Sequence, residues 1–330
     1  MTSLHARLAT ALPSGDVRRS VPLSTMSRWR IGGPADLLVT PSSREALAAT
    51  LQIIRDERVP HVIIGDGSNL LFDDQGFRGI VLRIGRAFAS VEIEAGGLVR
   101  AGGGIWVPSF VRHTISAGLS GVVHAIGIPG TLGGLCVMNG GSQRKGIGDH
   151  VVSVDAMDYD GSVRTLGREE LGFAYRCSRL QQGDLIVIGA TLQLEPGDRD
   201  ALRREAIEIL ASRRAKFPKV RANCGSVFVS DPKLYSLIGP PGKAIEEAGL
   251  KGVSAGDAQI SPDHANFIVN NGAARSADVL ALIRRARGRV AELTGIAMDA
   301  EVRHVAPDGI VRPAHEVAEI SPELIQGDYR

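Results

Sequence analysis

Aromatic residues and an excess of charge of either sign are both scarce in this sequence. Phe, Trp and Tyr together make up 4% of the 330 residues, and 38 basic residues are balanced by 36 acidic ones. A dedicated nucleic-acid binder usually needs a basic surface and aromatic side chains on which bases stack. We therefore expect no nucleic-acid partner. The hydrophobic fraction of 44% is that of a folded globular protein, and the length predicts two or three domains.

Cysteine is also rare, which bears on metal binding and on the cellular compartment. Cys136, Cys177 and Cys224 lie far apart and form no CxxC pair. A cysteine zinc site is therefore not expected, and the scattered thiols fit a reducing cytosol. The first 20 residues contain no apolar stretch of signal-peptide length. The apolar stretch 117–141 is broken by Pro129 and several glycines, so we expect no membrane span and a cytoplasmic protein.

The common nucleotide and hydrolase motifs are missing or out of context. Neither GxGxxG nor GxxxxGK[ST] occurs, which excludes the usual dinucleotide fingerprint and the P-loop. The stretch Gly252-Val-Ser-Ala-Gly256 matches GxSxG, but no apolar strand precedes it. A nucleophile elbow requires that strand, so we do not expect a serine hydrolase.

Hydrophobic periodicity predicts an α/β architecture. Ser42 and Glu45 suggest a capping box that opens a helix after a strand at 37–40. The pattern predicts further strands at 61–64, 79–84, 90–94, 98–101, 151–158 and 185–194, and helices at 107–117, 200–214 and 276–294. The polar segment 307–330 shows little periodicity and is expected to be a loose tail. A domain boundary is expected near 196–200.

Three glycine-containing stretches point to a ligand. They are Gly65-Asp-Gly-Ser-Asn-Leu-Leu71, Gly127-Ile-Pro-Gly-Thr-Leu-Gly-Gly134 and Asn139-Gly-Gly-Ser142. Successive backbone N–H groups in such loops can form anion-binding nests, and Ser68 and Asn69 add side-chain donors. Any single loop is more simply interpreted as a tight turn. Three of them between residues 65 and 142 favour an extended ligand that carries a diphosphate.

The second half of the chain contains a polar cluster suited to a phosphorylated substrate. Its members are Arg213, Arg214, Lys216, Asn223, Ser226, Lys251, Gln259, His264 and Asn266. Simpler interpretations remain open at this point. The arginine pair can be a solvated helix end, Ser226 can be a turn residue, and Glu301 can lie on the solvent face of a short strand.

Eight short motifs, in order from about residue 22 to 305, resemble one enzyme family. They are Arg30-Ile-Gly-Gly-Pro-Ala35, the 65–71 stretch, Gly118-Leu-Ser-Gly121, the 127–134 stretch, Tyr175-Arg-Cys-Ser178, Gly225-Ser-Val-Phe228, His264-Ala-Asn-Phe-Ile-Val-Asn270 and Glu301-Val302. Together they resemble the UDP-N-acetylenolpyruvoylglucosamine reductases, the MurB flavoenzymes of peptidoglycan synthesis. The compact spacing between Tyr175 and Ser226 is similar to the short form of the family, which lacks an inserted tyrosine loop.

The resemblance implies a fold and a domain plan. The expected class is α+β, with an FAD-binding fold of the vanillyl-alcohol-oxidase type and a C-terminal α/β substrate domain. The corresponding boundaries are an N-terminal segment 1–21, an FAD-binding domain 22–196 with subdomains about 22–85 and 86–196, a substrate-binding domain 200–305 and a tail 306–330.

The resemblance also implies a reaction and a set of site residues. NADPH reduces FAD, and hydride then passes to the enolpyruvyl double bond to give UDP-N-acetylmuramate. Arg176 resembles the arginine that holds the substrate carboxylate, Ser226 the proton donor, and Glu301 an assisting carboxyl group. The implied cofactor-binding residues are Gly65, Asp66, Gly67, Ser68, Asn69, Leu70, Gly127, Ile128, Pro129, Gly130, Thr131, Gly133, Gly134, Asn139 and Gly140. The implied substrate-binding residues are Lys216, Asn223, Gln259, His264 and Asn266.

The chain departs from the common family text at His124, at residues 139–145 and at residues 228–232. These departures leave open a related nucleotide-sugar as substrate. An oxidase of the same flavin fold is a second possibility, and it would typically tether FAD through His or Cys. A flavin-binding or nucleotide-sugar-binding protein without activity is a third.

Overall fold

The computed structural model describes residues 2–320, which pack into two compact units that we describe separately. Of the described residues, unit 1 comprises 2–19, 37–66 and 80–213, and unit 2 comprises 20–36, 67–79 and 214–320. Two segments from the first quarter of the chain therefore belong with its C-terminal third. The domain boundaries expected from the sequence are continuous, and they stay predictions.

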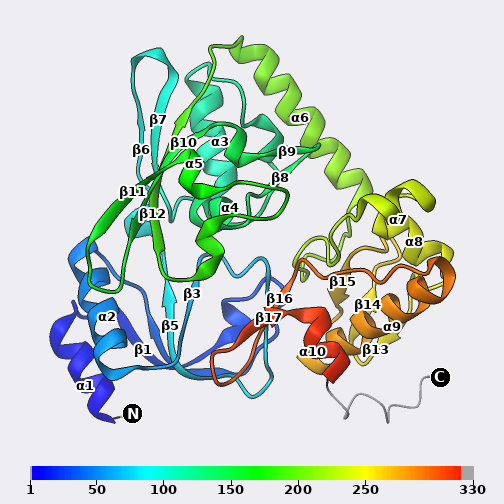
Figure 1. Cartoon of the computed structure of the whole chain (residues 1–330), viewed down its shortest axis with the longest axis horizontal. Coiled ribbons are helices and arrows are strands. Elements are labelled where there is room, and N and C mark those ends of the chain that lie inside the picture. Colours follow the sequence, from blue (N-terminus) through cyan, green and yellow to red (C-terminus); the bar gives the residue numbers. More distant parts are fainter. Residues whose placement is uncertain (1, 321–330) are drawn as a thin grey trace. The chain divides into compact units, whose positions relative to one another are not determined.

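A four-stranded sheet follows the predicted α/β pattern near the N-terminus (Figure 1). Its strand order is β1 (Val17–Pro22), β2 (Pro34–Val39), β5 (Phe77–Arg83) and β3 (His61–Ile64). β3 runs parallel to β5, with His61 opposite Ile80. The helix α2 (Arg44–Glu57) buries Leu47, Leu51 and Ile54 in the core of this region.

The helix α2 is confirmed, but its predicted cap is wrong by one residue. The N-cap is Ser43, whose Oγ accepts a hydrogen bond from the Ala46 N–H at 3.1 Å. Ser42 instead donates from its N–H and its hydroxyl to Asp16 Oδ2, each at 2.9 Å. The two adjacent serines have the same capping chemistry. The Asp16 carboxylate binds Ser42, and Ser43 therefore caps the helix.

A five-stranded antiparallel sheet forms the centre of the other core of unit 1 (Figure 1). Its order is β11 (Val163–Gly167), β10 (Val151–Met157), β12 (Ile186–Gln193), β7 (Leu98–Gly102) and β6 (Val91–Ile93). The helices α3 (Val107–Ser116), α4 (Leu132–Val137) and α5 (Arg168–Leu171) lie in the same unit, together with the hairpin of β8 (Gly141–Ser142) and β9 (Lys145–Gly146). The predicted strands at 151–158 and 185–194 and the helix at 107–117 are confirmed within a residue or two.

Unit 2 is built from short strands and helices. β13 (Ser254–Ala255), β14 (Ala258–Ile260) and β15 (Ile268–Asn270) form one sheet, and β17 (Val311–Pro313), β16 (Arg303–Val305) and β4 (Leu70–Phe72) form another. The helices are α7 (Pro232–Leu237), α8 (Pro241–Glu247), α9 (Ser276–Thr294) and α10 (Ala314–Ile320), and α6 (Arg199–Lys216) leads into the unit. Trp29 is fully buried in this core, and its Nε1 donates to the Ile268 carbonyl at 2.6 Å.

Near both ends of the described residues the structure contains elements that the sequence did not predict. The segment 307–320 is not a loose tail, because β17 and α10 lie within it and Ala314 and Ala318 of α10 are fully buried. The rest of the predicted tail, 321–330, lies outside the described residues. At the other end α1 (Thr2–Ala11), which the pattern did not predict, buries Leu4 and Leu8.

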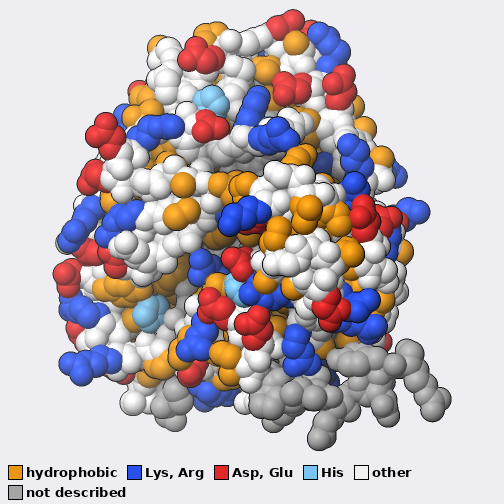
Figure 2. All heavy atoms as spheres, turned by 45° about the vertical axis from the view of Figure 1, so that its right-hand side comes forward, with side chains coloured by type: hydrophobic (Ala, Val, Ile, Leu, Met, Phe, Trp, Pro, Cys, Tyr) orange, Lys and Arg blue, Asp and Glu red, His pale blue; other side chains and the backbone are white. Residues whose placement is uncertain are grey.

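The surface charge agrees with the nearly equal numbers of basic and acidic residues. On the face shown in Figure 2, Lys and Arg side chains are interspersed with Asp and Glu side chains. Between residues 2 and 320, no helix has both the length and the apolar character that crossing a membrane requires.

Two glycines of α9 should respond oppositely to substitution by alanine. Gly288 is exposed inside the helix and a Cβ there meets nothing within 4 Å, whereas Gly295 ends the helix at φ +72°. Gly288→Ala should therefore raise the free energy of unfolding by about 0.8–1 kcal/mol, because alanine loses less backbone entropy on folding. Gly295→Ala should lower it, because the left-handed conformation disfavours a Cβ. Urea titrations of both variants measure the difference, and a loss of stability in Gly288→Ala would contradict this account.

Candidate active site

In unit 1, the start of the first predicted cofactor loop meets the second loop. Gly65 follows β3 directly, and a Cβ at Gly65 would lie 2.2 Å from the Thr131 hydroxyl oxygen. Only glycine permits this approach of residue 65 to the 127–134 loop. Most residues of both loops are half-buried. Their backbone therefore stays within reach of a ligand, and Gly65 keeps the start of the first loop close to the second.

Thr131 also organises the loop to which it belongs. It is the N-cap of α4, and its Oγ1 accepts a hydrogen bond from the Gly134 N–H at 3.4 Å. The Gly133 N–H donates to the Gly103 carbonyl at 2.8 Å, which fastens the start of α4 to the turn after β7. Gly133 is thus used for packing, whereas Gly134 is exposed.

Arg213 is a candidate site residue whose position depends on a distant part of the chain. It lies in α6 and packs on Gly127, where an added Cβ would be 2.4 Å from the Arg213 Nε. Burial lowers the pKa of Arg213 to about 10, which leaves the side chain cationic at neutral pH. From the sequence, Arg213 was a candidate for binding a phosphorylated substrate, with a solvated helix end as the simpler alternative. Its signal was weak, because nothing local to α6 shows that Arg213 faces a glycine 86 positions earlier in the chain.

The two loops and Arg213 fit the diphosphate of an FAD. In unit 1, Gly65, Asp66 and the 127–134 segment offer backbone N–H groups and the Thr131 hydroxyl, and Arg213 adds a positive charge beside Gly127. Backbone nests together with an arginine are the groups that commonly bind phosphates in proteins. The donor chemistry therefore agrees with the expected cofactor.

The third predicted loop, residues 139–142, makes hydrogen bonds to neighbouring backbone segments. Asn139 adopts φ +40°; its Nδ2 donates to the Ala174 carbonyl at 2.8 Å, and its Oδ1 accepts from the Gly148 N–H at 2.9 Å. The Gly140 N–H donates to the Leu135 carbonyl at 2.7 Å. Asn139 therefore ties the end of α4 to the turn that carries Arg176.

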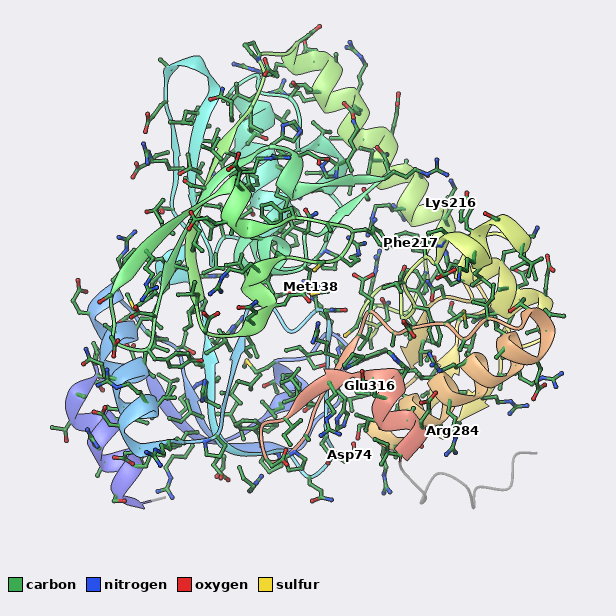
Figure 3. The ribbon with its side chains drawn as sticks, viewed as in Figure 1. Asp74, Met138, Lys216, Phe217, Arg284 and Glu316 are labelled. Atoms are coloured by element: carbon green, nitrogen blue, oxygen red, sulfur yellow. The ribbon has the colours of Figure 1, made fainter. Side chains whose placement is uncertain are left out.

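Arg176 sits at a strained position in that turn. Ala174 and Cys177 exchange two backbone hydrogen bonds of 3.1 Å, and Arg176 between them has φ +54°. A positive φ is unfavourable for residues other than glycine, and such strain concentrates at functional sites. Gln181 Nε2 donates to the Arg176 carbonyl at 2.9 Å and to the Val137 carbonyl at 3.2 Å, and it lies 3.8 Å from the Sδ of Met138 (labelled in Figure 3). The turn is thereby fixed on the end of α4.

Ser226 and Glu301 come together in unit 2 although 75 positions separate them. The Glu301 N–H donates to the Val227 carbonyl at 2.8 Å, and Phe228 pairs with Ala300 in an isolated antiparallel bridge. Asn69 Nδ2 also donates to the Glu301 carbonyl, at 3.1 Å. Ser226 and Glu301 are both half-buried. Glu301 lies just before β16 and not within a strand, which corrects the strand expected there.

The three amide side chains among the predicted substrate residues bond to the protein backbone. Asn266 is buried, accepts from the Phe228 N–H at 2.9 Å and donates to the Phe228 carbonyl at 3.0 Å. Asn223 accepts from the Gly225 N–H at 3.1 Å, and Gln259 donates to the Gly252 carbonyl at 3.0 Å. Asn266 and Asn223 therefore hold the segment that carries Ser226 from both sides.

The other two predicted substrate residues differ in their surroundings. His264 packs edge-on against Phe217 and Phe267 at ring-centroid distances of 5.7 and 4.9 Å, and burial lowers its pKa. Lys216 is exposed and ends α6 (Figure 3). Arg176 belongs to unit 1, whereas Ser226 and Glu301 belong to unit 2.

Comparison with known proteins agrees with this geometry. Residues 35–167 match the family model of the FAD binding domain, and residues 217–305 match that of the C-terminal domain of UDP-N-acetylenolpyruvoylglucosamine reductase. The chain is 50% identical to UDP-N-acetylenolpyruvoylglucosamine reductase 1 of Corynebacterium glutamicum, over 91% of this chain and 89% of that protein. It is 43% identical to the reductase of Heliobacterium modesticaldum, over 89% of this chain and 92% of the relative.

A solved structure extends the likeness to the fold. The crystal structure of the MurB reductase from Thermus caldophilus superposes with a TM-score of 0.73 at 35% identity. The match covers 87% of this chain and 98% of the Thermus chain. The mixed fold is therefore that of an FAD-binding domain followed by the reductase C-terminal domain. This chain belongs to the UDP-N-acetylenolpyruvoylglucosamine reductase family.

Proposed function

We propose that this chain reduces the enolpyruvyl group of UDP-N-acetylglucosamine enolpyruvate with NADPH and FAD, giving UDP-N-acetylmuramate for peptidoglycan synthesis. The observation that carries the proposal is the hydrogen bond from the Glu301 N–H to the Val227 carbonyl, which sets Glu301 beside Ser226. The backbones that carry a serine and a glutamate from distant positions are thus joined, and in a member of this family this supports an acid at the reacting carbon.

The 65–70 and 127–134 loops would hold FAD, with Arg213 beside its diphosphate. FAD when bound accepts hydride from NADPH and supplies it to the enolpyruvyl double bond. The chain contributes binding, orientation and a proton. These are the usual tasks of a protein that uses an organic redox cofactor.

Arg176 would stabilise the negative charge that develops on the substrate, and Ser226 would neutralise it with a proton. Hydride addition to the methylene carbon places negative charge on the carbon that bears the carboxylate. The planar Arg176 guanidinium can donate two hydrogen bonds to that carboxylate and stabilise the developing charge. The Ser226 hydroxyl then gives its proton to the carbon, with Glu301 assisting at the same site. A serine is a weak acid, and it serves here because the carbanion is strongly basic and the hydroxyl is positioned in advance.

We also assign the chain to the short form of the family. Between Tyr175 and Ser226 the structure contains one short helical turn (Arg179–Gln182), β12 and α6. These elements leave little room in the sequence for an inserted tyrosine loop.

The cofactor assignment predicts a yellow protein. Denaturing the purified chain should release FAD and not FMN, because two loops and Arg213 are arranged for a diphosphate. Chromatography of the released flavin measures this, and retention of the colour by acid-precipitated protein tests for a covalent link. A colourless protein that takes up no FAD on reconstitution would contradict the proposal.

A further inference from the structure

The hairpin of residues 141–146 lies next to Arg176 and is strained. Its strands β8 and β9 are joined by Gln143 and Arg144, which have φ +56° and +63°. Two-residue hairpin turns of this kind favour Asn and Gly, because both central residues need positive φ. A turn made of Gln and Arg costs conformational energy, so contacts from outside the hairpin must hold it in place.

His124 provides such contacts through Ser142. The Ser142 N–H donates to His124 Nδ1 at 3.4 Å, and the Ser142 hydroxyl donates to the His124 carbonyl at 2.5 Å. The His124 residue is 2% exposed, and within residues 2–320 its buried Nε2 has no hydrogen-bond partner. The polar anchoring of this ring therefore depends on Ser142.

The ring is suited to accept a hydrogen bond at neutral pH. Burial lowers the pKa of His124 to about 4, the positive charge of Lys145 and nearby His150 act in the same direction, and Asp149 opposes them. The imidazole is therefore neutral, and Nδ1 carries a lone pair toward the Ser142 N–H.

The residue before Ser142 contacts Arg176. Arg176 Nη2 donates to the Gly141 carbonyl at 3.4 Å. Gln181 fixes the backbone of Arg176, as described above, and the Gly141 carbonyl contacts its guanidinium. A shift of the hairpin would move this carbonyl and rotate the planar group that is to meet the substrate carboxylate.

We propose that His124 and Ser142 are positioning residues, which hold the Gly141 carbonyl in place and thereby orient the Arg176 guanidinium toward the enolpyruvyl carboxylate. This proposal rests on the proposed role of Arg176. It separates the two half-reactions, because reduction of FAD by NADPH does not involve that carboxylate. Misplacement of a binding group by about 1 Å can reduce a rate by up to about a hundredfold.

The test uses the FAD-loaded enzyme and graded variants. Ser142→Ala removes the hydroxyl, and Ser142→Thr retains one. His124→Leu removes the acceptor, and His124→Asn restores an acceptor oxygen. Ser236→Ala is the matched control, because it removes a hydroxyl-to-carbonyl bond of 2.8 Å, to Pro232, on an exposed helix.

We expect Ser142→Ala and His124→Leu to slow flavin reoxidation by the enolpyruvyl substrate at least about fivefold and to raise its KM, as misplacement of the binding group predicts. Flavin reduction by NADPH should stay within about twofold of wild type, because that step makes no use of the substrate carboxylate. Ser142→Thr and His124→Asn should recover part of the loss, and Ser236→Ala should show none. Stopped-flow absorbance measures both steps.

A double variant that combines Ser142→Ala with Arg176→Lys tests whether Ser142 acts through Arg176. If Ser142 acts through Arg176, Ser142→Ala should slow the Arg176→Lys enzyme by less than about twofold further, because the two changes affect one interaction. Full additivity, or normal reoxidation in His124→Leu while Arg176→Lys is slow, would overturn the positioning proposal alone. Normal reoxidation in Arg176→Lys would overturn the role of Arg176 and this proposal with it.

Discussion

Ser226→Ala should slow flavin reoxidation by the enolpyruvyl substrate by at least about a hundredfold and leave flavin reduction by NADPH nearly unchanged. A positioned general acid typically contributes on the order of a hundredfold or more to a rate. Only reoxidation requires a proton at the substrate carbon. Stopped-flow absorbance of the two steps under anaerobic conditions measures them separately.

Variants at the same and at another position control for indirect effects. Ser226→Cys should recover part of the rate, because a thiol is a stronger acid than a hydroxyl. Ser236→Ala should change neither step, because the exposed Ser236 hydroxyl donates to the Pro232 carbonyl within α7. Equal slowing of both steps in Ser226→Ala would show that Ser226 is a turn residue that supports the fold.

Arg176→Lys should reduce turnover about tenfold or more, a loss of about 1.4 kcal/mol or above in transition-state stabilisation. Lysine keeps the positive charge but lacks the planar pair of donors that suits a carboxylate. The loss should appear in reoxidation and in the KM for the enolpyruvyl substrate, and steady-state kinetics with stopped-flow absorbance show both.

The strained backbone at Arg176 supplies a separate control. Arg176→Gly relieves the positive φ of +54° but removes the guanidinium. If the side chain is what matters, the glycine variant should be at least as slow as the lysine variant. Normal turnover in either variant would indicate that Arg176 serves the turn and not the substrate.

Elements with strong local patterns could be predicted from the sequence. The helix α9 has apolar residues at helical spacing and a glycine directly after Thr294, and both bounds agree with the structure. The strands β10 and β12 are rich in apolar residues and were predicted within about a residue. The glycine loops could be identified because closely spaced glycines let a backbone approach a ligand or another loop closely.

Features that depend on distant partners could not be predicted. No local pattern places residues 20–36 and 67–79 with the C-terminal third of the chain. Likewise, no local pattern shows that the amides of Asn266 and Asn223 bond to the backbone around Ser226, and their binding of substrate stays a prediction. A polar side chain in a sequence shows what it can bond to, and only the fold shows which partner is near.

The chemical roles of Ser226 and Glu301 were predicted from the resemblance to the family, because composition and periodicity do not indicate them. Ser226 in a turn and Glu301 beside a short strand are ordinary when considered singly. The structure adds the hydrogen bond between the Glu301 N–H and the Val227 carbonyl, and the Asn69 amide on the Glu301 carbonyl. The second of these contacts joins a residue of the first glycine loop to the C-terminal third of the chain.

The most direct test of the central claim is the visible absorbance of the purified, FAD-loaded protein under anaerobic conditions. Addition of NADPH should bleach the oxidised flavin, and subsequent addition of UDP-N-acetylglucosamine enolpyruvate should restore its absorbance as UDP-N-acetylmuramate forms in equal amount. A flavin that NADPH bleaches but the enolpyruvyl compound fails to restore would contradict the proposed reaction.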